Sequence, residues 1–294
     1  MRVAVTGANG AVGRAILRAV PSLELVAVVR SERAAADLRP MVGGARVVCV
    51  SYDDAAGLGP AFEGAAAVIH LAGILVERPG ATYEEANVET TRRVADAARR
   101  ASATKLVFVS ATGADPRSTN RYWRTKAEAE AVVRSSGLSH TVLRVPVLLG
   151  RGTEAATALR HRLGQRTIPL LRGGRTLQQP LAVDDLARAA LAACDPAVAR
   201  DRTLELVGPL AVPGREIVER AARLMARPVR IVAIPVSLVR LALAIGRLTG
   251  WRGFSTDALE VLTTDTTLDP APAARELGIT LTALDDMIRQ SVQP

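Results

Sequence analysis

Tyr122 and Lys126 combine a phenol with an ammonium group, four residues apart in a segment rich in helix-forming residues. Four residues make about one helical turn, so a helix over Arg121–Arg134 would place both side chains on one face. A nearby cation stabilises a phenolate and lowers the pKa of the phenol, which suits the pair to proton transfer. The alternative is an exposed tyrosine beside an exposed lysine, because the Tyr-x-x-x-Lys spacing alone often occurs by chance.

A glycine-rich turn near the first residue follows a short apolar run and opens a helix-forming segment. A first glycine can take a positive φ, a second lets backbone approach a pyrophosphate, and a third lets helix pack on strand. The N–H groups at the helix N-terminus would then face the phosphates. We predict a dinucleotide-binding loop rather than a plain tight turn. Its members are Gly7, Asn9, Gly10, Ala11, Val12 and Gly13.

Six short apolar runs alternate with helix-forming segments in the first half of the chain. They are Val3–Thr6, Leu25–Val29, Val47–Val50, Val68–Leu71, Leu106–Ser110 and Thr141–Leu143. Runs that are apolar on both faces suit a parallel sheet covered by helices, and the alternation implies right-handed βαβ units. The predicted fold class is α/β, a doubly wound parallel Rossmann sheet with a smaller, mostly helical C-terminal substrate lobe.

The pattern is less regular after Gly150. Gly164–Thr176 is typical of loops and short strands, and Thr203–Val207 of one more strand. Helices are predicted at Asp184–Ala193, Gly214–Met225, Val236–Leu248, Ser255–Leu262 and Leu281–Ser291. We expect residues 1–150 to form the dinucleotide-binding Rossmann domain, and residues 151–294 to form a substrate lobe interleaved with late Rossmann elements.

The glycine spacing, GxxGxxG, resembles that of the extended and atypical short-chain dehydrogenase/reductases. Four further motifs of that superfamily follow in order: Val68–Gly73 (VIHLAG), Asn87–Thr91 (NVETT), Tyr122–Lys126 (YWRTK) and Leu143–Pro146 (LRVP). Gln179–Asp185 (QPLAVDD) resembles a late segment of the same superfamily. Around Phe108–Glu130 and Pro235 the chain is most similar to the group of the complex I nucleotide-binding accessory subunit and its bacterial NAD(P)H-binding relatives.

The resemblance implies roles for the chemical residues. Tyr122 would exchange a proton with the substrate oxygen, Lys126 would bind the nicotinamide ribose, and Asn87 would order a water behind the lysine. The family's substrate-binding Ser or Thr aligns nearest Ala111. Either Ser110 or Thr112 substitutes for it, or the site lacks this partner. Further cofactor contacts are implied for Leu71, Ala72, Gly73 and Val145.

The second apolar run ends in Arg30, where NAD-specific sites usually carry an acid. An arginine suits the dianionic 2′-phosphate, and Arg14, directly after Gly13, is placed to help. We therefore predict a preference for NADP(H), with NAD(H) as the alternative. Relatives commonly have Gly-Asp after the third strand, whereas this chain has Val50 and Ser51, so Ser51 and backbone groups would hold the adenine.

The composition of the chain limits the kinds of partner and ligand that we expect. The net charge is +9, but the arginines are scattered singly and aromatic residues make up only 3%, so no nucleic-acid footprint is expected. Two cysteines and three separated histidines indicate no disulfide framework and no metal site. We expect a cytoplasmic protein without a signal peptide or a transmembrane span. The oligomeric state is not indicated.

Val236–Leu248 predicts an amphipathic helix with a small and basic stripe at Ser237, Arg240, Ala244 and Arg247. Its apolar face would either close the substrate lobe or contact a membrane surface, which would make the protein peripheral at the membrane. Membrane contact would fit a lipophilic small-molecule substrate.

We interpret the chain as an NADP(H)-dependent oxidoreductase. It would transfer a hydride between the nicotinamide and a carbonyl or alcohol carbon, or run related epimerase or dehydratase chemistry. The alternative is a non-catalytic NAD(P)H-binding accessory, assembly or redox-sensing protein. The pair of Tyr122 and Lys126 favours the enzyme, whereas Ala111 favours the alternative.

Overall fold

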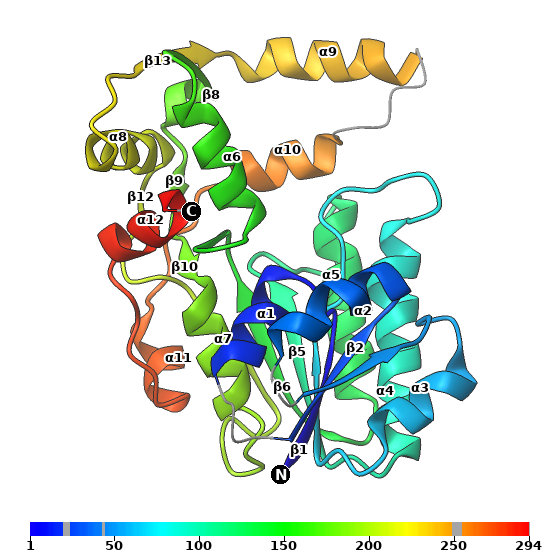
Figure 1. The fold of residues 1–294 in the computed structure, drawn as a ribbon. Helices are drawn as coiled ribbons and strands as arrows, with labels where there is room; N and C mark the ends of the chain where they lie inside the picture. Colours follow the sequence, from blue (N-terminus) through cyan, green and yellow to red (C-terminus); the bar gives the residue numbers. More distant parts are fainter. Residues whose placement is uncertain (20–23, 43–44, 249–254, 294) are drawn as a thin grey trace.

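Seven parallel strands form one sheet in the order β11-β6-β5-β4-β1-β2-β3 (Figure 1). The computed structural model describes residues 1–19, 24–42, 45–248 and 255–293. The strands are β1 (Arg2–Thr6), β2 (Glu24–Val29), β3 (Arg46–Cys49), β4 (Ala67–His70), β5 (Lys105–Ala111), β6 (Ser139–Val145) and β11 (Arg202–Glu205). This architecture confirms the predicted Rossmann-type α/β class, and all seven strands overlap runs expected from the sequence.

Two apolar cores lie on opposite faces of the sheet, because successive strand residues point to opposite sides. In β1, Val3 and Val5 enter one core and Ala4 enters the other. The first core is covered by α1 (Ala11–Ala19), α2 (Glu32–Leu38), α7 (Val183–Ala192) and α11 (Ala271–Glu276). The second is covered by α3 (Ala55–Phe62), α4 (Thr90–Arg100) and α5 (Arg121–Arg134). Strand order reverses between β1 and β4, so the carboxyl ends of these strands flank a crevice, the usual ligand position in such sheets.

A smaller lobe is built around a third core. It contains α6 (Glu154–Leu163), α8 (Gly214–Leu224), α12 (Leu284–Val292) and the parallel pair β8 (Thr167–Leu171) and β13 (Arg230–Ile234). The short pairs are β7 (Leu148–Leu149) with β10 (Leu181–Ala182), and β9 (Leu177–Gln178) with β12 (Val212–Pro213). Two helices, α9 (Val236–Leu248) and α10 (Thr256–Thr263), complete it. Although β11 and α7 follow Gly150, they belong to the large sheet and its covering layer.

Three details differ from the sequence expectation. The helix predicted over the NVETT motif begins with a π-helical segment, Glu84–Glu89, before α4. Neither α6 nor β13 was expected. In α9, Leu243 is buried, but Leu238 and Leu241 are each 58% exposed, so the apolar face does not simply close the lobe. Within the predicted basic stripe, the side chains of Ala244 and Arg247 lie outside the described residues.

Candidate functional site

The glycine loop has the close packing that its sequence predicts. Gly7 has φ +71°, which favours glycine, and Gly10 N donates to Gly7 O at 3.0 Å. A Cβ on Gly13 would lie 2.4 Å from Ala8 O, so only glycine lets α1 approach the turn this closely. The loop thus places the start of α1 at the carboxyl end of β1, where unpaired N–H groups can receive phosphate oxygens.

A cavity of about 200 Å³ lies beside this loop. It is lined by predicted residues, namely Gly7, Asn9, Gly10, Arg30, Leu71, Ala72 and Gly73, and by Tyr52, Ile74, Ala86 and Thr90, which were not predicted. The Tyr52 hydroxyl accepts from Gly7 N at 2.6 Å and donates to Val28 O at 3.3 Å. It therefore links the glycine loop to β2. The Arg30 guanidinium lies 5.7 Å from the centre of the Tyr52 ring.

Two other predicted cofactor residues take different positions. Ser51 does not line this cavity; its side chain is exposed and accepts from Asp53 N at 3.3 Å. Arg14 donates from Nε to Asn9 O at 2.9 Å, so it fastens the loop backbone. Tyr52, the next residue, lines the cavity instead, so the role of Ser51 at the adenine stays a prediction. An aromatic residue three positions after the third strand was the available signal.

Lys126 is buried at the carboxyl end of β5. Its ammonium donates to Val109 O at 2.8 Å and lies 4.4 Å from the centre of the Phe108 ring. Burial lowers the pKa of Lys126 to about 8, a shift that the carboxylate of Glu130 partly opposes. A cavity of about 220 Å³ is shared by Lys126, Tyr122, Asn87, Gly73 and other residues, including Leu71, Ser110 and Val145.

Asn87 connects this cavity to the loop after β4. Its Oδ1 accepts from Ile74 N at 3.0 Å and its Nδ2 donates to Thr125 Oγ1 at 3.2 Å. A Cβ on Gly73 would lie 3.0 Å from Asn87 Oδ1 and 3.7 Å from Lys126 Nζ. Asn87 therefore holds the β4 loop against α5, beside the lysine, and its predicted role in ordering a water stays a prediction.

Tyr122 stands between two cavities, since it lines both the Lys126 cavity and a second one of about 210 Å³. Burial raises the pKa of Tyr122, and the neighbouring Tyr83, whose ring centre is 5.9 Å away, raises that pKa further. The expectation that Lys126 lowers the phenol pKa is not met in this structure. The ammonium is bound to Val109 O, and the phenol is kept protonated.

The two hydroxyls that flank Ala111 differ in their partners. Ser110 Oγ donates to Glu130 Oε1 at 2.6 Å, and that carboxylate also receives two bonds of 2.8 Å from Arg144. Burial alone would raise the pKa of Glu130, but these hydrogen bonds outweigh it and hold the pKa below its usual range. Thr112 Oγ1 is buried and has no hydrogen bond of normal length within the described ranges, although Thr112 lies near enough to Glu205 to lower the pKa of that carboxyl group. Of the two candidates for the substrate-binding hydroxyl, Thr112 is therefore the one whose hydroxyl is more available to a ligand.

The cavity of about 210 Å³, which shares Tyr122 with the Lys126 cavity, is mostly apolar. It is lined by Leu75, Ala111, Thr112, Gly113, Tyr122, Trp123, Val145, Pro146, Val147, Gln178, Gln179, Val261, Leu262, Thr264, Asp265 and Thr266. Its one charged member, Asp265, accepts from Leu177 N at 2.8 Å, and no lysine or arginine of the described chain lines it. Trp123 Nε1 is buried and has no hydrogen-bond partner among the residues that the structure describes, so a second uncommitted donor accompanies Thr112.

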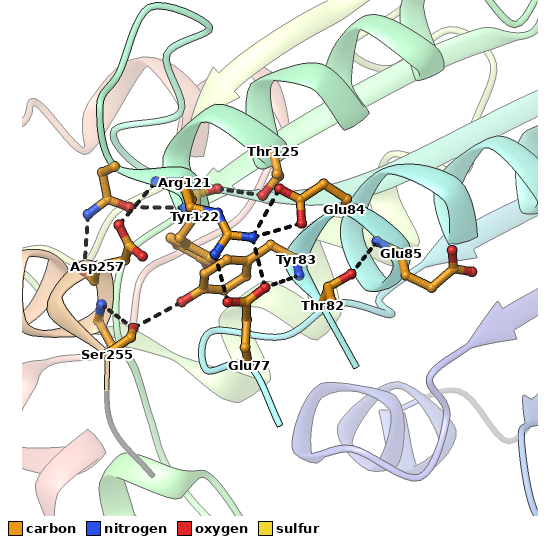
Figure 2. Close-up of polar contacts among 12 residues, drawn as sticks. Glu77, Thr82, Tyr83, Glu84, Glu85, Arg121, Tyr122, Thr125, Ser255 and Asp257 are labelled. Carbon is orange, nitrogen blue, oxygen red and sulfur yellow. Dashed lines mark hydrogen bonds and ion pairs between the residues drawn. The ribbon is translucent and has the colours of Figure 1, made fainter. Parts of the chain in front are cut away.

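The N-terminus of α5 is fastened to α10 by contacts far apart in sequence (Figure 2). Asn120 Oδ1 caps α5 by accepting from Tyr122 N at 3.1 Å, while its Nδ2 donates to Asp257 O at 3.0 Å and to Glu260 Oε2 at 2.9 Å. Arg121 pairs with Glu77 at 2.9 Å and with Glu84 at 3.0 Å. These contacts fix the turn that carries Tyr122, and the sequence did not indicate them.

His70 is a packing residue. It lies between Thr6 Oγ1 at 2.7 Å and Thr91 Oγ1 at 3.1 Å and stacks on Phe108. Burial, with a contribution from the Lys126 charge, lowers the pKa of His70 to about 3, so it is neutral at ordinary pH. Within the described ranges no cluster of three or more potential metal ligands occurs, and no helix is long and apolar enough to cross a membrane.

Comparison with known proteins agrees with the motifs. A family model described as NAD(P)H-binding matches residues 7–195. The 40 kDa subunit of mitochondrial NADH-ubiquinone oxidoreductase from Neurospora crassa is 26% identical over 282 residues, which cover 94% of this chain and 74% of that protein. A ceramide reductase from Caulobacter vibrioides is 30% identical over 154 residues, covering 51% of this chain and 47% of the relative. The chain therefore aligns with about half the length of this second relative.

Among solved structures, UDP-glucuronic acid 4-epimerase from Bacillus cereus, in complex with UDP-glucuronic acid and NAD, has a TM-score of 0.78. The superposition covers 99% of this chain and 98% of the epimerase at 14% identity. At this identity the match establishes the shared Rossmann fold alone.

Proposed function

Because the chain belongs to the NAD(P)H-binding family, we propose that it is an NADP(H)-dependent oxidoreductase that interconverts a carbonyl and an alcohol. The observation that carries the proposal is the position of Tyr122. Its side chain forms a common wall between the cavity that contains Lys126 and the apolar cavity under α10. A phenol at this boundary can reach a substrate on one side and a cofactor-bound region on the other.

The loop and its neighbours fit a dinucleotide. The contact that a Cβ on Gly13 would make with Ala8 supports the proposal, because it means that α1 packs closely on the turn, with its N-terminal N–H groups at the loop. In the proposal, the Gly7–Gly13 loop holds the pyrophosphate, Arg30 holds the 2′-phosphate, and Lys126 binds the nicotinamide ribose. Tyr52 and Thr90, which line the same cavity as Arg30, would contact the adenosine half. The bound cofactor would supply or accept a hydride.

The residues of the chain would handle the proton. The raised pKa of Tyr122 keeps the phenol protonated, so it can donate to the substrate oxygen as negative charge develops there during reduction. Thr112 Oγ1, buried and without a hydrogen bond of normal length, would donate to the same oxygen in place of the hydroxyl missing at Ala111. Below pH about 8 the ammonium of Lys126 remains charged and favours negative charge nearby.

The lining of the apolar cavity under α10 supports a proposal for the substrate class. An anionic group such as a diphosphate would find no cationic side chain among its described lining residues, and it would face Asp265. Apolar walls with a few uncommitted donors suit an uncharged molecule with an apolar body and one or two oxygen acceptors. We therefore propose a lipophilic ketone, aldehyde or quinone rather than a nucleotide sugar.

A second candidate function is supported by Ala111. Loss of the substrate-binding hydroxyl at that position suits a protein that holds NAD(P)H without turning it over, as an accessory, assembly or redox-sensing factor. The similarity to a complex I subunit supports the same reading. Tight NADPH binding without oxidation by any member of a carbonyl and quinone panel would establish it in place of the enzyme.

The experiment for the enzyme compares wild type with Tyr122→Phe. Consumption of NADPH with a panel of apolar ketones and quinones should fall at least about 100-fold in the variant, because a general acid contributes on the order of 10²–10⁴-fold. The cofactor dissociation constant should change by less than about twofold, since the phenyl ring is retained. Thr112→Val should lower kcat by about tenfold or more, whereas Ser110→Ala should act mainly on stability through Glu130. Unchanged turnover in Tyr122→Phe would contradict the proposal.

A further inference from the structure

The outer layer of the small lobe, formed by β8, β13 and α9, is both basic and apolar. Figure 1 shows α9 as a single helix at the extremity of the molecule, continuing from the end of β13. On this layer Val232 is 40% exposed, and Leu238 and Leu241 are each 58% exposed. Large apolar side chains exposed on neighbouring elements commonly mark a contact site.

The periodicity of α9 separates an inner from an outer side. Val236 and Val239 are half-buried and Leu243 is buried, which is the spacing of one helix face packed on the lobe. Leu238 and Leu241 are three residues apart on the opposite side, and the exposed Arg240 lies on the flank between the two sides. A cationic side chain next to exposed leucines is the pattern of a helix that lies in a lipid headgroup region.

The two-stranded sheet of β8 and β13, which precedes α9, also exposes apolar and basic side chains. The register of β8 and β13 places Val232 opposite Pro169, and both are exposed. Arg230 at the start of β13 and Arg172 after β8 are also exposed, and neither forms an ion pair within the described part of the chain. The layer therefore offers unneutralised charge together with apolar surface.

The sequence around this layer carries charge of one sign. From Arg223 to Thr256 there are six arginines and no aspartate or glutamate. Elsewhere arginines are commonly paired, as Arg121 is with Glu77 and Glu84. No acid within these 34 residues neutralises the arginines, so the segment itself carries only positive charge.

We propose that the surface formed by Val232, Leu238, Leu241, Arg172, Arg230 and Arg240 docks on a membrane that contains anionic lipids. The arginines would meet lipid phosphates and the leucines would enter the boundary between headgroups and acyl chains. A second copy of the chain suits the surface less well, because it would bring like charges together. A nucleic acid would neutralise the arginines but would leave the leucines in water.

The test is sedimentation of the full chain with vesicles. Wild type should sediment with equal parts of phosphatidylglycerol and phosphatidylcholine at low salt, should be released as salt rises, and should not bind phosphatidylcholine alone. Each basic side chain near an anionic surface is worth about fivefold in affinity, so Arg230→Glu with Arg240→Glu should weaken binding at least about 25-fold. The matched control is Arg46→Glu with Arg99→Glu, the same change in net charge at exposed positions of the other lobe.

A second pair of variants tests the apolar contribution. Leu238→Ser with Leu241→Ser should weaken vesicle binding at least tenfold, whereas Leu210→Ser, at a leucine that is 47% exposed outside the surface, should not. Failure of wild type to sediment at low salt, or an equal loss in the Arg46/Arg99 control, would overturn the proposal. Self-association that depends on Leu238 and Leu241, without vesicle binding, would also overturn it. None of these outcomes depends on the proposed enzymatic activity.

Discussion

Replacing Arg30 with alanine should remove the preference for NADPH over NADH. Arg30 directly follows β2, is exposed, and lines the cavity beside the glycine loop without an ion pair among the described residues. A hydrogen bond to a charged group contributes about 1.5–3 kcal/mol, so NADPH affinity should fall roughly 13- to 160-fold. NADH has no 2′-phosphate, and its affinity should change by less than about twofold. The contact of Arg30 with the Tyr52 ring is worth about 0.5–1 kcal/mol at an exposed site, so the fold should tolerate its loss.

The assay is a fluorescence titration of wild type and variants with both cofactors. Arg30→Lys keeps the charge but not the planar guanidinium, and should retain part of the preference. Arg33→Ala is the control, because Arg33 is an exposed arginine in the first turn of α2 that does not line the cavity. Equal affinities of wild type for NADPH and NADH would refute the reasoning. So would a loss in Arg33→Ala as large as that in Arg30→Ala.

Three further predictions concern the loop, the lysine and the buried carboxylate. Gly13→Ala would place a Cβ 2.4 Å from Ala8 O and should weaken the binding of NADPH and NADH alike by about 5- to 150-fold in the same titration. Gly59→Ala is the control, because a Cβ at Gly59 would have no atom within 4 Å, and it should leave both affinities unchanged. The reductive kcat at saturating NADPH should fall above pH about 8, where the ammonium of Lys126 loses its proton, and a profile flat to pH 10 would contradict this role. Glu130→Ala leaves Arg144 without its bidentate partner and should cost about 3–5 kcal/mol in urea unfolding, whereas the exposed Glu128→Ala should cost under about 0.5 kcal/mol. Because the folded pKa of Glu130 lies below its usual range, that stabilisation should be complete above pH about 4.5 and fade as pH falls below it.

Motifs defined by local spacing predicted the fold and the position of Tyr122 and Lys126 on one helix at a common cavity. The glycine loop, the alternating apolar runs and the four-residue spacing of Tyr122 and Lys126 depend on one strand or one helix each, so periodicity sufficed. The sequence also carries a local signal for α6, which is an N-cap threonine: the Thr153 side chain accepts from Ala156 N at 3.1 Å.

Features that join distant segments could not be predicted in this way. Asn120 meets Asp257 and Glu260 across more than 130 residues of sequence, and no periodic pattern encodes that contact. The raised pKa of Tyr122 depends on burial and on Tyr83, both set by tertiary packing. Ser51 and Tyr52 are adjacent, and only the local course of the chain after β3 decides which one faces the cavity.

The most direct test of the central claim is the transfer of deuterium from NADPH labelled at the reactive carbon of the nicotinamide to an apolar ketone. Wild type should yield an alcohol with deuterium on the carbinol carbon, and Tyr122→Phe should bind the cofactor equally but form at least about 100-fold less product. Tight NADPH binding by wild type, without transfer to any ketone, aldehyde or quinone tested, would contradict the proposal that Tyr122 and Lys126 serve an oxidoreductase.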